Sequence, residues 1–163
     1  MRKGFSEDGY ITDQEQLTDF PYRTVTTDYN GCGWIACYNL RRYLGEDIDP
    51  MDVCREMDAM HRLRFPGPTT MRVMRRYLDK YVVNYKETHD KAPAVRAAKQ
   101  AKAGIFRYYE ERVPHFITFL HVEGDLYRFL NVNDDMWDFT STIGDFALKH
   151  FVFGPVIALT VPK

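Results

Sequence analysis

A cysteine between two glycines is the feature of this sequence that points most directly to chemistry. Cys32 follows Gly31 and precedes Gly33, at the start of a segment whose apolar spacing predicts an amphipathic helix. The amide groups and the dipole at the N-terminus of a helix stabilise a thiolate, which is the nucleophilic form of cysteine. The two glycines are expected to leave room for a substrate backbone. We therefore expect Cys32 to act as a nucleophile.

The other two cysteines, Cys37 and Cys54, favour structural roles. Cys37 falls within the apolar stripe of the helix after Cys32, and Cys54 lies beside the stripe of a second helix. Buried cysteines commonly act as small hydrophobic residues. Three cysteines do not indicate a disulfide framework, and no Cys and His spacing resembles a metal site. We expect neither a metal nor a cofactor.

A thiol whose pKa stays near the ordinary value of about 8.5 needs a base to react well at neutral pH. His115 is the strongest candidate among the five histidines, because Pro114 and the apolar run 116–120 predict that it opens a rigid β-strand. His121 lies at the other end of this strand, beside a loop. Surface or capping positions are favoured for the remaining three, His61, His89 and His150.

A base of this kind also needs a third group to orient its ring. A three-residue loop at 123–125 would join two antiparallel strands in a register that places His115 opposite Asn133. Asn131 then lies diagonally opposite on the same face, where its amide oxygen could accept a hydrogen bond from the ring. Asp134 falls on the other face. The alternative is that the two asparagines simply end a strand and begin a turn.

The helices that must position these groups are indicated by apolar periodicity and by capping residues. The first helix after Cys32 is expected to end at Gly45, and the second to begin at Asp49 and Pro50. A third is expected to begin at Thr69 or Thr70. Its outer face is basic, with Arg72, Arg75, Arg76 and Lys80; a solvated surface is the favoured interpretation and a binding role the alternative.

The second half of the chain predicts mainly strands. A short helix is expected over 91–103, ended by Gly104, and another over 143–151. Aromatic and β-branched runs predict strands at 105–111, 116–122, 126–132 and 155–161. Helices first and antiparallel strands afterwards indicate an α+β fold. We expect one domain over 1–163, in which 1–24 form an extended N-terminal arm.

Composition limits the class of protein. With 163 residues, of which 45% are hydrophobic, the chain can bury a substantial core. A net charge of -1 gives no electrostatic argument for nucleic acid or an anionic membrane. No apolar run approaches the roughly 20 residues that span a bilayer, and the first residues lack the apolar centre of a signal peptide. We expect a cytoplasmic protein with no nucleic-acid or membrane partner.

Taken in order, three motifs resemble those of the papain-like cysteine peptidases, and most closely their small bacterial branch, the C39-like peptidases. The motifs are CGWIAC at 32–37 at a helix start, HFITF at 115–119 in a strand, and Asn131 ending the next strand. The resemblance covers roughly residues 25–161. It implies a helical layer carrying the nucleophile Cys32, packed on an antiparallel β-sheet carrying His115 as general base and acid. Asn131 would be the orienting residue.

The same resemblance raises the question of the oxyanion hole. The family places a glutamine a few residues before the cysteine, but residues 25–30 contain none. Asn30 could donate the required hydrogen bond beside the backbone amide of Cys32. Loss of one oxyanion donor typically lowers the rate by about 10²–10³.

The function implied is that of a cysteine peptidase or related thiol hydrolase, which cleaves a peptide or amide bond of a peptide or protein substrate through an acyl-enzyme. The alternative is a catalytically inactive papain-like domain that binds an extended peptide. The sequence does not separate hydrolysis from acyl transfer, and it does not indicate an oligomeric state.

Overall fold

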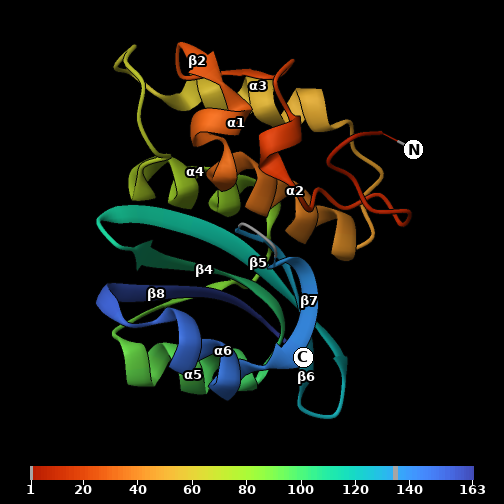
Figure 1. Cartoon of the computed structure of the whole chain (residues 1–163), viewed down its shortest axis with the longest axis vertical. Helices are drawn as coiled ribbons and strands as arrows, with labels where there is room; N and C mark the ends of the chain where they lie inside the picture. The colour runs from red at the N-terminus through yellow and green to blue at the C-terminus, as the bar shows by residue number, and fades with distance from the viewer. Residues whose placement is uncertain (1, 134–135) are drawn as a thin grey trace.

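A six-stranded antiparallel β-sheet lies between two layers of helices in the computed structural model, which describes residues 2–133 and 136–163 (Figure 1). In spatial order the sheet contains β3 (Lys86–His89), β8 (Phe153–Pro162), β4 (Ala101–Glu110), β5 (Val113–Glu123), β6 (Leu126–Asn133) and β7 (Met136–Thr142). The α+β class and the helical layer on an antiparallel sheet are as the sequence predicts.

The helices divide between the two faces of the sheet (Figure 1). One layer contains α1 (Thr27–Asn30), α2 (Cys32–Tyr43), α3 (Pro50–Met60) and α4 (Met71–Tyr81), and the other contains α5 (Lys91–Lys99) and α6 (Ile143–His150). Because both faces are covered, the strands alternate between two cores. Ile105 and Phe116 face the α1–α4 layer, whereas Phe106 and Phe119 stack on each other in the second core, with ring centroids 4.4 Å apart.

The expected helix boundaries of the first layer are confirmed. The side chain of Asp49 accepts a hydrogen bond from the amide of Met51 at 2.7 Å, and Thr70 accepts one from Val73 at 3.2 Å. Gly45 follows the last turn of α2 with a φ of +96°, a conformation that favours glycine. Each capping residue acts on the helical turn beside it, so the helix ends can be located from the sequence alone.

The helix expected over 91–103 is shorter, because α5 ends at Lys99 and Gly104 lies within β4. A Cβ atom on Gly104 would lie 2.6 Å from the carbonyl oxygen of Leu159 and 2.6 Å from the ring of Phe119. The glycine is therefore required by close packing within the sheet and does not end a helix. Two strands that the sequence did not predict, β3 and β7, are the polar edges of the sheet, where one-sided burial weakens the apolar pattern.

The N-terminal residues differ from the extended arm expected over 1–24. They contain a short 3₁₀ helix η1 (Gln14–Gln16) and the first strand of a hairpin, β1 (Pro21–Tyr22), which pairs with β2 (Val25–Thr26). Phe20 is buried and stacks on Trp34 of α2, with ring centroids 5.4 Å apart. This packing brings η1 to the N-terminal end of α2. In the described part of the chain, no helix combines the length and apolarity needed to cross a membrane.

The register of the central hairpin is the predicted one. Thr118 of β5 pairs with Leu130 of β6, and Phe119 pairs with Phe129, which is the register that sets residue 115 opposite residue 133. An irregularity near the turn pairs Glu123 with Leu126, so the connection is one residue shorter than expected. Residue 131 consequently lies diagonally across from His115.

We expect Gly104→Ala to destabilise the protein by about 1–3 kcal/mol, because the new methyl group would overlap a neighbouring strand and an aromatic ring. The matched control is Gly144→Ala in α6, where the nearest atom to a new Cβ is the amine of Lys99 at 4.0 Å. That variant should be unchanged or up to about 1 kcal/mol more stable. Urea denaturation measures both, and equal loss in the two variants would contradict this account of Gly104.

Candidate active site

The thiol of Cys32 lies at the first residue of α2, beside a cleft of about 320 Å³. The cleft is lined by residues from four separate segments, among them Gln14, Asn30, Cys32, Gly67, Pro68 and His115. Cys32 itself is only 5% exposed. Its position combines the partial positive charge of a helix N-terminus with a site largely closed to water.

Cys32 and His115 are brought together where the start of α2 meets the start of β5. Both side chains line the same cleft, where Cys32 is buried and His115 is partly buried, and they interact closely enough that each shifts the pKa of the other. Thr118, three residues further along β5, donates a hydrogen bond to the carbonyl oxygen of Ala36 in α2 at 2.9 Å. This hydrogen bond fixes the position of α2 along β5, and it therefore fixes the position of the Cys32 thiol relative to the imidazole ring of His115.

The two ionisable groups shift each other in opposite directions. Burial raises the pKa of the Cys32 thiol, but the hydrogen bond and charge of His115, together with the amide of Phe116, outweigh burial and hold the pKa below its ordinary value. Burial lowers the pKa of His115, but the hydrogen bond and charge of Cys32, aided by Glu110, raise it to about 9. This pattern favours a thiolate–imidazolium pair.

The ring of His115 is oriented from its far side by residue 131, through the main chain. Nε2 of His115 lies 2.9 Å from the carbonyl oxygen of Asn131 and donates to it, which leaves Nδ1 to face Cys32. This corrects the expected contact, in which the side-chain amide oxygen of Asn131 accepts from the ring. Asn131 has a φ of +62°, and the pairing of β6 with β7 is irregular between Leu130 and Asn133. The bulge redirects the carbonyl group toward the histidine.

The side chain of Asn131 instead holds Gln14. Its Oδ1 accepts a hydrogen bond from the backbone amide of Gln14 at 3.0 Å, and its Nδ2 donates to Oε1 of Gln14 at 3.1 Å. Asn133 lines a different pocket, together with Glu110 and His150. Asp134 lies outside the described residues.

Gln14 is the cleft residue that sequence reasoning missed. Gln14 lies well before residues 25–30, where the family's glutamine is expected, and it reaches the cleft because the N-terminal segment folds back onto α2. Its Nε2 donates to the carbonyl oxygens of Thr27 at 3.2 Å and Asp28 at 3.4 Å. The N-terminal segment contains two glutamines, Gln14 and Gln16, and nothing in the sequence alone distinguishes which one enters the cleft.

Asn30 lines the same cleft, where the sequence analysis placed it as an oxyanion donor. Its Nδ2 donates to the carbonyl oxygen of Gly67 at 2.8 Å, and its Oδ1 is buried with no hydrogen-bond partner among the described residues. One of the two amide hydrogens of Asn30 is therefore already used to hold the wall of the cleft.

The glycines beside Cys32 serve internal packing and not substrate access. A Cβ on Gly31 would lie 2.3 Å from the side chain of Thr27, and a Cβ on Gly33 would lie 2.2 Å from that of Thr69. Both positions are buried. The glycines let α2 begin tightly against its neighbours, which corrects the role that the sequence analysis gave them.

The remaining cysteines are buried away from the cleft. The thiol of Cys37 lies 3.2 Å from the sulfur of Met74, and that of Cys54 donates to the carbonyl oxygen of Pro21 at 3.3 Å. Burial raises the pKa of Cys37 well above its ordinary value and that of Cys54 to about 12. Of the three thiols, only that of Cys32 has a lowered pKa.

Comparison with known structures identifies the fold. The structure is similar to the crystal structure of the peptidase domain of Streptococcus ComA, a bi-functional ABC transporter involved in a quorum-sensing pathway, with a TM-score of 0.50 and 12% sequence identity. The similarity covers 80% of this chain and 90% of the ComA domain. The chain therefore has the papain-like fold of a C39 peptidase domain. No family model and no curated protein sequence matches it.

We expect His115→Ala to raise the pKa of Cys32, because the burial that opposes ionisation remains while the imidazolium is lost. Alkylation of Cys32 by iodoacetamide at about pH 6 should slow at least about tenfold, since its rate follows the thiolate fraction. Mass spectrometry distinguishes Cys32 from the other two cysteines. His121→Ala, at the far end of β5, is the control; equal slowing in both variants would contradict the pairing.

Asn131→Gly separates the two roles of residue 131. Glycine keeps the left-handed backbone and its carbonyl group but loses both side-chain hydrogen bonds to Gln14. We expect the alkylation rate of Cys32 to stay within about threefold and the stability to fall by about 1–3 kcal/mol. Asn131→Ala, which strains the backbone, should be the more damaging to Cys32 reactivity. Loss of reactivity in Asn131→Gly equal to that in His115→Ala would show that the side chain orients the ring.

Proposed function

We propose that this protein is a cysteine peptidase or related thiol hydrolase that cleaves a peptide or amide bond through an acyl-enzyme. The observation that carries the proposal is that Cys32, at the N-terminus of α2, and His115 line one cleft, where each shifts the pKa of the other toward the charged pair. A papain-like fold supports it as the scaffold on which such a pair acts. Peptides are the substrate class that the cleft would take.

In the first step, the thiolate of Cys32 attacks the carbonyl carbon of the scissile bond and forms a tetrahedral intermediate. The imidazolium of His115 then gives its proton to the leaving nitrogen, so that the amine departs and a thioester remains on Cys32. Because Asn131 holds Nε2 through its carbonyl oxygen, Nδ1 is the nitrogen that carries this proton. The residues thus fill the roles of nucleophile, acid and orienting group.

In the second step, His115 accepts a proton from water as the water attacks the thioester. The acyl group leaves as a carboxylic acid, and the pair of Cys32 and His115 is restored. An amine in place of water would give acyl transfer by the same route. The rate should rise as Cys32 ionises and fall as the pH passes the pKa of His115 near 9, above which the imidazolium is lost.

The charge on the tetrahedral oxygen requires donors near Cys32. The backbone amide of Cys32 is one, and we assign the side-chain amide of Gln14 as the second, because Asn131 binds both the backbone N–H and the side-chain Oε1 of Gln14. The hydrogen bond from Gln14 to Asp28, at 3.4 Å, is long enough to be exchanged for a substrate oxygen. Asn30 is the competing candidate.

The alternative function is a peptide-binding domain without turnover. It is favoured by one observation: the side-chain amides of Gln14 and Asn30 both donate to backbone carbonyl oxygens of the protein itself. In such a domain Cys32 would line the peptide site without forming a covalent bond.

Digestion of a peptide library, with mass spectrometry of the products, tests the two functions. We expect cleavage that is abolished by Cys32→Ala, and a loss of about 10²–10³ in rate in Gln14→Ala with a smaller loss in Asn30→Ala. Gln16→Ala, in the same 3₁₀ helix, is the matched control. Binding of library peptides that survives Cys32→Ala, with no cleavage by the unaltered protein, would overturn the peptidase proposal in favour of the binding domain.

A further inference from the structure

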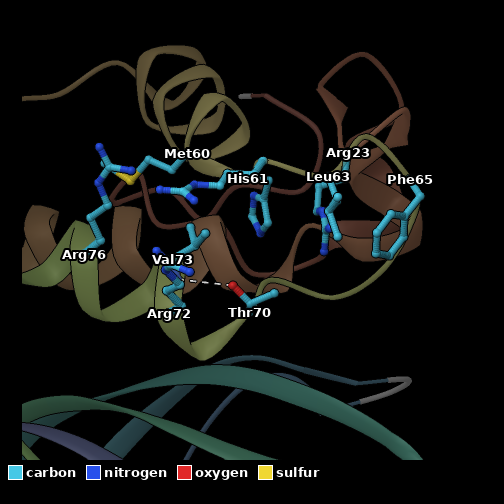
Figure 2. Close-up of a pocket in the computed structure, with 10 residues that line it drawn as sticks. Arg23, Met60, His61, Leu63, Phe65, Thr70, Arg72, Val73 and Arg76 are labelled. Atoms are coloured by element: carbon cyan, nitrogen blue, oxygen red, sulfur yellow. Dashed lines mark hydrogen bonds between the residues drawn. The ribbon is translucent and has the colours of Figure 1, made fainter.

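A second pocket, of about 290 Å³, lies apart from Cys32 between the end of α3 and the first turn of α4. Figure 2 shows the ring of His61 descending from the end of α3 toward Thr70 and Val73 of the helix below. The first turn of α4 adds the partial positive charge of a helix N-terminus. Nothing in the proposed peptidase chemistry uses this pocket.

The pocket is surrounded by positive charge. Four arginines line it: Arg23, Arg62, Arg72 and Arg76. Within residues 2–133 and 136–163, none of the four forms an ion pair with a carboxylate. Like charges gathered in this way repel one another unless an anion lies between them.

The basic face of α4 divides into two parts. Arg75 pairs with Glu87 at 2.7 Å and Lys80 with Glu56 at 2.8 Å, so these cations are neutralised by the protein itself. Arg72 and Arg76, one helical turn apart, are exposed at the rim of the pocket. The predicted solvated surface therefore holds for both arginines, and neither is neutralised by a carboxylate among the described residues.

Two buried nitrogen atoms in the pocket have no hydrogen-bond partner in the described part of the chain. They are Nε of Arg23, whose residue is 5% exposed, and Nε2 of His61, whose residue is 6% exposed. The nearby Asp58 accepts from the backbone amide of Arg23 at 2.8 Å. Nδ1 of His61 donates to the carbonyl oxygen of Met57, which leaves Nε2 to accept from a ligand hydroxyl or, once protonated, to donate to an anion.

Most of the remaining lining is apolar. Leu63 and Phe65 are 65% and 50% exposed, so both present apolar surface at the pocket. The guanidinium of Arg23 lies 5.1 Å from the centre of the Phe65 ring. Met60 and Val73 complete the apolar surface. A ligand that fits must therefore carry an apolar body as well as a charge.

We propose that this pocket binds a small organic anion, a carboxylate or phosphate monoester attached to an apolar group of about the size of a phenyl ring. The anion lies among the arginines and accepts a hydrogen bond from Nε of Arg23, and the apolar group packs on Phe65 and Leu63. Arg23 also donates to the carbonyl oxygen of Pro68 at 2.6 Å, so the bound ligand shares a wall with the cleft of Cys32.

Isothermal titration calorimetry of the protein with phenylphosphate tests this proposal. We expect saturable binding that Arg72→Gln/Arg76→Gln weakens at least about tenfold, because two cations near the anion are removed. Arg96→Gln, on α5 in the other helical layer, should bind normally. Cys32→Ala should also bind normally, so the result does not depend on the peptidase proposal. Absence of saturation, or equal weakening in Arg72→Gln/Arg76→Gln and Arg96→Gln, would overturn it.

Three further probes define the ligand chemistry. Benzyl alcohol lacks the charge and inorganic phosphate lacks the ring, and either one binding as tightly as phenylphosphate would overturn the proposal. Phe65→Ala should weaken phenylphosphate several-fold and leave inorganic phosphate unchanged. Benzoate distinguishes the two anions that the proposal includes: tighter binding of benzoate supports a carboxylate ligand, and tighter binding of phenylphosphate supports a phosphate monoester.

Discussion

The buried contact between the N-terminus of α2 and the start of β5 is the constraint on which the candidate active site depends. It places a thiol against an imidazole in a region of low dielectric, where each group stabilises the charged form of the other more strongly than water would allow. Burial alone would neutralise both groups. The site therefore requires that helix and strand keep a fixed separation, which the hydrogen bond from Thr118 to Ala36 and the glycines beside Cys32 support.

Asn131 joins this pair to the rest of the site. Its left-handed backbone turns a carbonyl group toward His115, and its side chain holds Gln14 by two hydrogen bonds. Asn131, at an irregular point of β6, thus positions both His115, the base, and η1, which carries the Gln14 that would stabilise the oxyanion. Backbone strain of this kind persists only where surrounding contacts determine it, and here those contacts come from η1, a segment far away in the sequence.

The segment between α3 and α4 has two sides with different chemistry. Carbonyl groups of Gly67 and Pro68 hold Asn30 on the cleft side and Arg23 on the side of the arginine-lined pocket. The cleft is lined by Cys32 and His115, whereas the other pocket combines apolar side chains with arginines that form no ion pair among the described residues. The segment between α3 and α4 therefore lines both the cleft of Cys32 and the arginine-lined pocket. Its position depends on the hydrogen bonds that Asn30 and Arg23 donate to it.

Local features could be predicted from the sequence alone: the helix that begins at Cys32, the caps at Asp49 and Thr70, and the β5–β6 register that brings residue 131 near His115. These follow from short-range spacing and turn geometry. Three other features could not be predicted: the backbone carbonyl of Asn131, and not its side-chain amide, contacts His115, Gln14 enters the cleft, and Gly104 lies within a strand. Each of these depends on contacts between segments distant in the chain, and such contacts leave no periodic signal in the sequence.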